Sequence, residues 1–221
     1  MSGLKLYSYC NSSASWRVRI VLNLKNLKYQ YIPVNLLKDE QKSPAYRKIS
    51  PNMAVPTLAD GDAKLIESTA IIEYLEETCE NTYQILPKNS VQRAKIRGFS
   101  EIINSAMQPM QNLRLLKQLE GDHGIDKIQF TLGWLNHGCQ ALETLIAQEQ
   151  EYQNAQSNYC FGDKITLADV YLYPQIMGSI RRFNLDVSQY PNLTRIMENL
   201  KKQEAFVKSE PRFQPDFPKD K

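Results

Sequence analysis

The sequence predicts two unlike domains: a small α/β domain at residues 1–83 and an all-helical domain at residues 91–221. Three observations lead to this fold class. Strand and helix patterns alternate in the first part, a polar linker with a proline follows at residues 84–90, and only helical periodicity is found beyond it. A chain of 221 residues is long enough for two domains with a core each.

The first domain opens with a strand and a helix. Residues 4–9 alternate apolar and polar side chains, as a half-buried strand does. Residues 13–24 are apolar on two sides of a helix, so most of this helix is expected to be buried. Its polar side chains Arg17, Arg19 and Asn23 are expected to form a narrow solvent-exposed edge.

A second strand, a hairpin and a closing helix complete the first domain. Residues 29–34 form the second predicted strand. Residues 55–58 and 64–66 predict two further strands, joined by a turn at residues 60–62. A helix with one apolar face begins at Ser68.

The second domain is predicted to consist of helices. Long periodic segments span residues 91–119, 130–148 and 166–182. Residues 148–158, rich in Gln, Glu and Asn, predict a loop, and the proline-rich residues 211–218 predict an extended tail.

The last of these helices carries two local signals. Thr166 can cap it, with Asp169 three residues later in the arrangement of a capping box. Pro174 lies inside the helix and predicts a kink, because proline lacks an N–H group and its ring clashes with the preceding turn.

Composition limits the possible functions. Hydrophobic residues make up 42% and charged residues 23%, which is typical of globular proteins. The net charge of +3 comes without a basic cluster, and Lys25 is taken as ordinary surface charge, so nucleic-acid binding is not expected. No signal peptide or membrane span is recognisable. Four separated cysteines and two histidines predict a reduced, cytoplasmic protein without a metal site.

Three features of the first domain point to a ligand. Ser12 and Ser13 stand where a helix begins, and the free N–H groups and partial positive charge there favour an anion. The bond between Val55 and Pro56 can be cis, which would turn the Val55 backbone outward to pair with an extended peptide. An ordinary serine N-cap and an edge-strand proline are the alternatives.

The third feature is Glu67 followed by Ser68 at the next helix start. Ser68 and the adjacent N–H groups suit a carboxylate, while Glu67 can accept hydrogen bonds from an ammonium group. Together they would clamp an α-amino-acid head group. The simpler alternative is an N-cap with an acid favoured by the helix dipole.

The order of these features resembles the zeta class of glutathione transferases, which carries maleylacetoacetate isomerases. The resemblance rests on Leu6 to Tyr9, Ser12 to Ile20, Val55 to Leu58, Glu67 to Leu75, Gln108 to Leu113 and Thr166 to Asp169. It implies a thioredoxin-like N-terminal domain, a helical domain that carries the electrophile side of the site, and a homodimer. It also implies glutathione-dependent isomerisation of maleylacetoacetate to fumarylacetoacetate, a step of aromatic amino-acid catabolism, with glutathione as cofactor.

The same resemblance assigns roles to individual residues. It implies that Ser12 or Ser13 holds the glutathione thiolate, with Ser12 as the first choice. The other implied glutathione contacts are Gln41, Val55, Glu67, Ser68, Gln108 and Asn112. An arginine before a phenylalanine late in the chain is implied to meet substrate carboxylates, which indicates Arg182.

The chain departs from the class pattern at several places. Ala14 stands where the class has a cysteine, and Glu67 replaces the more typical glutamine. Residues 50–54 lack a polar pair that often precedes the Val-Pro step. The segment before Phe183 is one residue longer than usual, so Arg181 and Arg182 compete for the substrate role.

Three other functions stay open at this stage. The same site could conjugate glutathione to other small electrophiles or dehalogenate them. Cys10 begins a Cys-x-x-Ser sequence, which on a thioredoxin-like domain could catalyse thiol–disulfide exchange. A non-catalytic glutathione-binding regulator is the third possibility.

Overall fold

The computed structural model describes residues 3–218 and divides the chain into two compact units. The first joins the residues up to Gln84 with those from Gln203 onward, and the second runs from Ile85 to Lys202. The sequence places residues from 203 onward in the helical domain, whereas the structure groups them with the N-terminal one. The reason is hydrogen bonding: the side chains of Trp16 and Arg19 both donate to Ser209.

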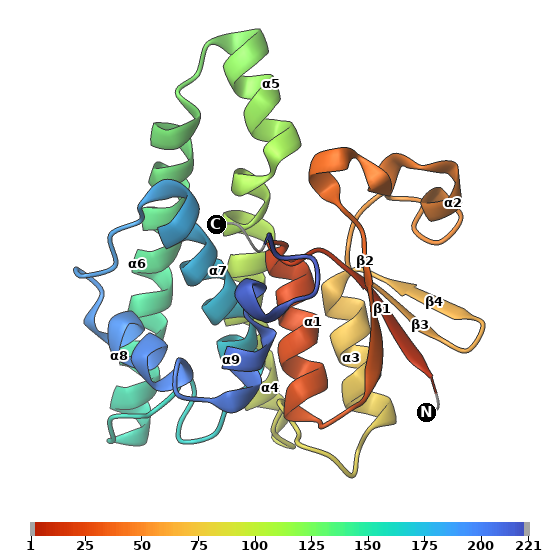
Figure 1. Cartoon of the computed structure of the whole chain (residues 1–221). Helices are drawn as coiled ribbons and strands as arrows, with labels where there is room; N and C mark the ends of the chain where they lie inside the picture. Colours follow the sequence, from red (N-terminus) through yellow and green to blue (C-terminus); the bar gives the residue numbers. More distant parts are fainter. Residues whose placement is uncertain (1–2, 219–221) are drawn as a thin grey trace. The chain divides into compact units, whose positions relative to one another are not determined.

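A four-stranded sheet forms the centre of the N-terminal unit (Figure 1). Its strands are β1 (Leu4–Ser8), β2 (Tyr29–Pro33), β3 (Thr57–Asp60) and β4 (Ala63–Ile66), in the order β2-β1-β3-β4. β1 and β2 are parallel, while β3 is antiparallel to both β1 and β4. Gly61 lies in the β3–β4 turn with φ of 56°, a conformation that glycine adopts without steric cost. The four predicted strands are confirmed.

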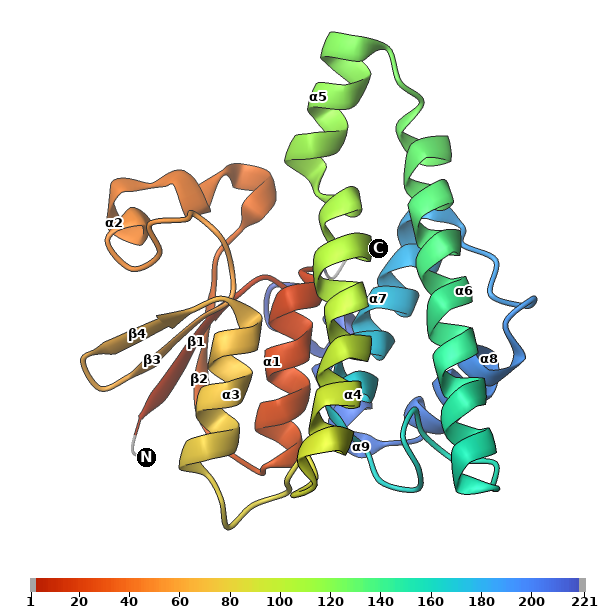
Figure 2. The same ribbon diagram turned by 180° about the vertical axis from the view of Figure 1, so that it is seen from behind.

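Two helices, α1 (Ser13–Leu24) and α3 (Ser68–Thr78), lie side by side next to this sheet in both ribbon views (Figures 1 and 2). Short helical segments connect β2 to β3: η1 (Leu36–Lys38), η2 (Glu40–Lys42) and α2 (Pro44–Arg47). The end of the chain forms α9 (Glu204–Ser209) and the 3-10 turn η5 (Pro211–Phe213), so the predicted extended tail is wrong for this part.

The expected exposed edge of α1 is also wrong, because Arg17 and Arg19 are only 1% and 0% exposed. Arg19 donates to the carbonyl oxygens of Cys10 (2.9 Å) and Ser209 (3.0 Å). Arg17 donates to the hydroxyl of Ser68 (3.4 Å). A buried guanidinium is tolerated when its fixed N–H groups find acceptors, and the fold supplies them for Arg19.

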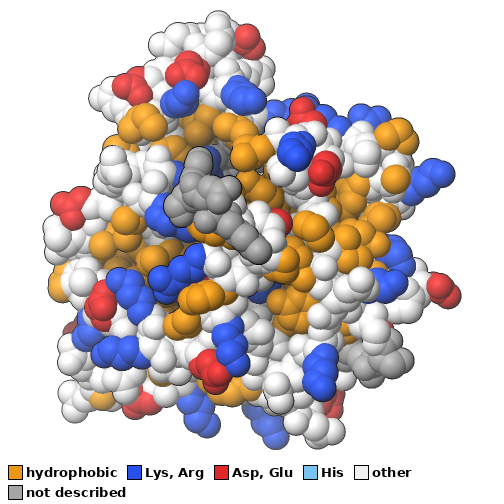
Figure 3. Space-filling model, viewed as in Figure 1, with side chains coloured by type: hydrophobic (Ala, Val, Ile, Leu, Met, Phe, Trp, Pro, Cys, Tyr) orange, Lys and Arg blue, Asp and Glu red, His pale blue; other side chains and the backbone are white. Residues whose placement is uncertain are grey.

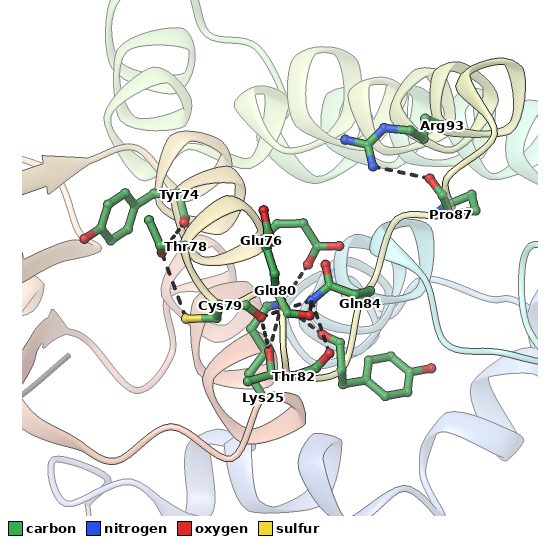
Figure 4. Close-up of polar contacts among 11 residues, drawn as sticks. Lys25, Tyr74, Glu76, Thr78, Cys79, Glu80, Thr82, Gln84, Pro87 and Arg93 are labelled. Atoms are coloured by element: carbon green, nitrogen blue, oxygen red, sulfur yellow. Dashed lines mark hydrogen bonds and ion pairs between the residues drawn. The ribbon is translucent and has the colours of Figure 1, made fainter.

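Lys25 is likewise buried rather than a surface charge (Figure 4). Its ammonium nitrogen lies 2.8 Å from Glu76 Oε2, and it donates to Thr82 Oγ1 (3.3 Å) and the Tyr83 carbonyl (2.9 Å). The ion pair and the two hydrogen bonds together compensate the burial of this charge. They tie the end of α1 to α3 and to the segment that follows it.

The C-terminal unit is helical, as predicted. It contains α4 (Ser90–Glu101), the π-helical turn η3 (Ile102–Met107), the 3-10 turn η4 (Pro109–Gln111), α5 (Leu113–His123), α6 (Lys127–Gln153), α7 (Leu167–Phe183) and α8 (Pro191–Leu200).

Two predicted boundaries in this unit are wrong. The segment 91–119 is not one helix: Gln108 N–H bonds five residues back to Ile103, and Pro109 cannot continue the ladder. The second helix is longer than 130–148, because Asp126 caps its start and it runs to Gln153. The first part of the predicted loop at 148–158 is therefore helix.

The capping box of α7 is confirmed. Asp169 Oδ2 accepts from the Thr166 N–H (2.8 Å) and hydroxyl (3.0 Å), and Oδ1 accepts from Cys160 N–H (2.9 Å). Asp169 is fully buried, and burial raises the pKa of its carboxyl group. α7 runs through Pro174, and the predicted kink there stays a prediction.

The surface shows Lys and Arg side chains spread over the face seen in Figure 3. Among the described residues, no helix combines the length and apolar character that a membrane span requires. In the same part of the chain, no three His, Cys, Asp or Glu side chains gather as a metal site would require.

Candidate functional site

The strand register brings three separate segments to one edge of the sheet. Tyr7 of β1 pairs with Thr57 of β3, and Thr57 pairs in turn with Ile66 of β4. The residues after β1, before β3 and after β4 therefore meet at the same edge. These are the segments that contain Ser12, Val55 and Glu67.

The first segment ends at the N-terminus of α1. Ser12 is the N-cap residue, with φ −74° and ψ 117°, and its Oγ accepts a hydrogen bond from Ser15 N–H (3.2 Å). Because Oγ accepts this bond, its own hydrogen is left to donate to an anion. Ser13 is the first helical residue, and both serines are partly exposed. The first turn carries no acidic side chain to neutralise the helix dipole.

The second segment presents the backbone of Val55. The Val55–Pro56 bond is cis, as the sequence suggests. The preceding carbonyl, of Ala54, accepts from Tyr46 Oη (2.8 Å) and Ser50 Oγ (3.1 Å). These two hydrogen bonds fix the position of the loop before Val55. Within residues 3–218, the N–H and C=O of Val55 pair with no other backbone group, and they stay available for a peptide ligand.

The third segment is the start of α3. Glu67 is exposed, has φ of 66°, and its Oε1 accepts from Asn52 Nδ2 (3.0 Å). Ser68 is 5% exposed and its Oγ accepts from Arg17 (3.4 Å), which leaves its hydrogen to donate. The start of α3 thus combines a carboxylate, a hydroxyl donor and free helix N–H groups.

Gln41, also expected to contact the ligand, lies on η2 in the same unit. Its Nε2 donates to Asp39 Oδ1 (3.2 Å), and its Oε1 is buried without a hydrogen-bond partner. Its role in ligand binding stays a prediction.

The other expected residues belong to the helical unit. Gln108 lies at the junction of η3 and η4, and Asn112 caps α5 by accepting from Arg114 N–H (2.9 Å). Capping explains Asn112, whereas the Gln108 side chain makes no capping hydrogen bond. Contact of either residue with glutathione stays a prediction.

The two competing arginines at the end of α7 differ in their surroundings. Arg182 donates to the Gln111 carbonyl (3.1 Å), and its guanidinium carbon lies 4.9 Å from the centre of the Phe183 ring. Surrounding protein desolvates this guanidinium and lowers its pKa. Both arginines are exposed, and Arg181 donates to Met177 O within its own helix (3.4 Å). The geometry therefore favours Arg182 as the residue held ready for an anion.

Sequence reasoning missed Arg17, Asn52 and Gln111. The role of Arg17 could not be recognised from the sequence, because a charged helix residue is usually exposed. Its contact with Ser68 also joins residues that are 51 positions apart. Asn52 donates a hydrogen bond to Glu67, which lies 15 positions later in the chain, and nothing in the sequence relates the two residues. Gln111 lies within the class motif, which gave a signal that could have been used.

Cys10 does not have the surroundings of a redox-active thiol. It is 0% exposed, and desolvation followed by the negative charge of Asp216 raises its pKa to about 11. At neutral pH the thiolate fraction is on the order of one in ten thousand. The structure thus removes the support for thiol–disulfide exchange at this residue.

Comparison with known proteins identifies the class. The model of the glutathione S-transferase N-terminal domain matches residues 6–82, and that of the C-terminal domain matches residues 128–208. The chain belongs to the glutathione S-transferase family. The predicted fold class, a thioredoxin-like domain followed by a helical domain, is confirmed.

The individual relatives narrow this class. A maleylacetoacetate isomerase of Mus musculus is 39% identical, over 96% of this chain and 94% of its own. A zeta-class glutathione S-transferase of Euphorbia esula is 41% identical, over 96% and 92%. Among solved structures, a maleylpyruvate isomerase described as a bacterial zeta-class transferase is similar with a TM-score of 0.91, 35% identity and coverage of 97% and 100%.

A further solved structure is informative because of what it contains. A maleylacetoacetate isomerase of Anaeromyxobacter dehalogenans with glutathione bound in its active site has a TM-score of 0.85 and 37% identity. The match covers 98% of this chain and 98% of that one. The resemblance to the zeta class that the sequence motifs suggest is confirmed over nearly the whole chain.

Proposed function

We propose that this protein catalyses the glutathione-dependent cis–trans isomerisation of maleylacetoacetate to fumarylacetoacetate. One observation carries the proposal: the sheet register joins the acid-free N-terminus of α1, the Val55 backbone and the Glu67–Ser68 pair at one edge. Relatives named for this reaction, at about 40% identity over most of the chain, support it.

The residues at this edge fit glutathione group by group. The γ-glutamyl end carries an ammonium group and a carboxylate, which match the carboxylate of Glu67 and the donors at Ser68. The extended peptide in the middle matches the backbone groups of Val55. The sulfur, as an anion, matches the Ser12 hydroxyl and the N-terminus of α1.

The chemistry required of Ser12 can be stated as a free energy. A thiol with a pKa of ~8.5 needs preferential binding of its anion by about 2.7 kcal/mol to lower that pKa by about two units. One hydroxyl donor together with helix N–H groups supplies an amount of this order. When bound, glutathione supplies the thiolate that adds to the substrate double bond and leaves again after rotation.

Arg182 would stabilise the substrate, maleylacetoacetate. Its guanidinium is held by the Gln111 carbonyl and the Phe183 ring, so its position is fixed before a substrate carboxylate arrives. A positive charge held in place near developing negative charge lowers the barrier without reorganisation during the reaction.

The experiment is a comparison of Ser12→Ala with Ser13→Ala in glutathione-dependent isomerisation of maleylacetoacetate. We expect Ser12→Ala to lower kcat by about 10- to 100-fold, as loss of one hydrogen bond to a charged group would do. Glutathione binding should change far less, because Val55, Glu67 and Ser68 are intact. Turnover without glutathione, or equal losses of turnover and binding, would contradict the proposal.

Several parts of this function stay predictions. Conjugation or dehalogenation of other small electrophiles would use the same thiolate and can be measured alongside isomerisation. The homodimer can be tested by light scattering, and the cytoplasmic location by fractionation.

A further inference from the structure

We propose that Asp216 is a positioning residue that fixes the loop carrying Ser12. This inference rests on the proposed function, because the loop matters only if Ser12 meets the glutathione sulfur. Asp216 lies on the C-terminal strap, defined here as residues 204–218, which folds back onto the N-terminal unit.

The carboxylate of Asp216 binds two separate parts of the sheet edge. Its Oδ2 accepts from the backbone N–H of Cys10 (2.9 Å), in the loop after β1. Its Oδ1 accepts from Tyr31 Oη (2.6 Å), on the neighbouring strand β2. Hydrogen bonds to a charged acceptor are among the stronger ones in proteins, and two of them also fix the orientation of the carboxylate.

Arg19 holds the same loop from the other side. Its Nη2 donates to the Cys10 carbonyl (2.9 Å) and its Nη1 to the Tyr9 carbonyl (3.3 Å). Cys10 is therefore held at its N–H by Asp216 and at its C=O by Arg19. Ser12 N–H in turn bonds to the Tyr9 carbonyl (3.0 Å), so the position of Ser12 depends on this loop.

The strap is itself bound to α1, so the segment that carries Asp216 has a fixed position. Trp16 Nε1 donates to Ser209 Oγ (2.9 Å), and Arg19 Nε donates to the Ser209 carbonyl (3.0 Å). Gln214, two residues before Asp216, donates to the carbonyls of Lys208 and Glu210 (both 2.9 Å). Arg19 thus binds the strap and the loop at the same time.

The groups that face Asp216 keep their protons near neutral pH. Burial, with the hydrogen bond to Asp216 as second cause, raises the pKa of the Tyr31 hydroxyl, and burial likewise raises that of Cys10. Burial lowers the pKa of the Arg19 guanidinium, and the negative charge of Asp216 is one of several smaller influences that oppose this. The Tyr31 hydroxyl therefore remains a donor to Asp216 near neutral pH.

The test compares Asp216→Ala, Asp216→Asn and Tyr31→Phe in the full chain. Asparagine can preserve both contacts: its carbonyl oxygen accepts from Cys10 N–H, and its amide donates to the Tyr31 hydroxyl, which can accept. Asp62→Ala, which removes an exposed acid from the β3–β4 turn, is the matched control for loss of charge.

Three quantities should be measured. They are the pKa of the thiol of bound glutathione from its ultraviolet absorbance, the glutathione dissociation constant by calorimetry, and amide hydrogen exchange of residues 10–12 without ligand. For Asp216→Ala we expect the thiol pKa to rise by about one unit and kcat to fall about tenfold. This is the effect of losing about one hydrogen bond to the glutathione thiolate. Exchange should accelerate, while the dissociation constant changes little. Asp216→Asn should restore the thiol pKa, and Tyr31→Phe should have a smaller effect than alanine.

An unchanged thiol pKa in a folded Asp216→Ala variant would overturn the proposal, and so would an Asp216→Asn variant as impaired as alanine. If the alanine variant does not fold, Tyr31→Phe decides, because an unchanged thiol pKa there would also overturn it. If the unmodified protein binds glutathione but does not isomerise maleylacetoacetate, the proposed function fails, while the thiol pKa still tests Asp216. Failure to bind glutathione at all would overturn both.

Discussion

Two pairs of arginines, one in each unit, lie in different surroundings. Arg17 and Arg19 occupy what the pattern predicts as the exposed edge of α1, yet both are buried and donate to the loop, the strap and Ser68. Arg181 and Arg182 lie at the end of a mostly buried helix, and both reach the surface. The difference teaches that the apolar pattern of a helix does not by itself decide which of its arginines are buried.

The number of acceptors separates Arg19 from Arg182. Arg19 donates to four acceptors, on Ser8, Tyr9, Cys10 and Ser209. Acceptors on this scale offset the desolvation of a buried charge and leave nothing for a ligand. Arg182 donates to one carbonyl, that of Gln111, which fixes the guanidinium while its other N–H groups can reach an anion.

The largest expected effect is the loss of Arg19. Replacing Arg19 with alanine leaves buried carbonyl oxygens without donors and should lower the free energy of unfolding by about 3–5 kcal/mol. Arg19→Lys should recover only part of this, because an ammonium cannot span the same acceptors. Urea unfolding measures both, with Arg181→Ala as control. An Arg19→Ala variant as stable as the control would remove the distinction between the pairs.

The next effect separates Arg182 from Arg181. Arg182→Ala should lower kcat/KM for maleylacetoacetate by about 100-fold, the value of charge-assisted hydrogen bonds to one carboxylate, with little change in unfolding. Arg181→Ala should leave kcat/KM nearly unchanged. Steady-state kinetics with a substrate ester that lacks the carboxylate provides the second readout, since it should not distinguish the variants. The reverse ranking of the two alanine variants would assign the substrate role to Arg181.

The parts of the fold that the sequence could predict are those with local signals. Alternation predicted the first strand, and strand-type runs with a turn predicted the other three. The α7 capping box was visible as Thr166 and Asp169, because these signals are local. The break between α4 and α5 was missed although Pro109 is a local signal for it, because the apolar pattern continues across the π-helical turn. The return of the strap to the N-terminal unit depends on contacts about 190 residues apart, such as that between Arg19 and Ser209.

The candidate site likewise combines residues that local signals predict with residues that only the fold brings to it. Ser12, Val55 and Ser68 could be proposed from helix starts and a proline, because the chemistry of each is local. Their meeting at one edge depends on strand register, which side-chain alternation does not determine between strands. The parts that hold them, Arg17 and Asp216, reach across the fold and carry no sequence signal.

The smallest expected effect concerns the charges on either side of Ser68, where Arg17 is buried and Glu67 is exposed. Glu67→Gln keeps the shape and the acceptor for Asn52 but removes the charge. We expect glutathione to bind about two- to fivefold more weakly, because an exposed ion pair contributes little in water. The loss should shrink as salt is added, since salt screens exposed charges. Calorimetry at two ionic strengths measures this, with Asn52→Ala as a control that keeps the charge but frees its position. A loss well above fivefold that added salt does not reduce would mean that Glu67 is desolvated when glutathione binds, as Arg17 already is in the fold.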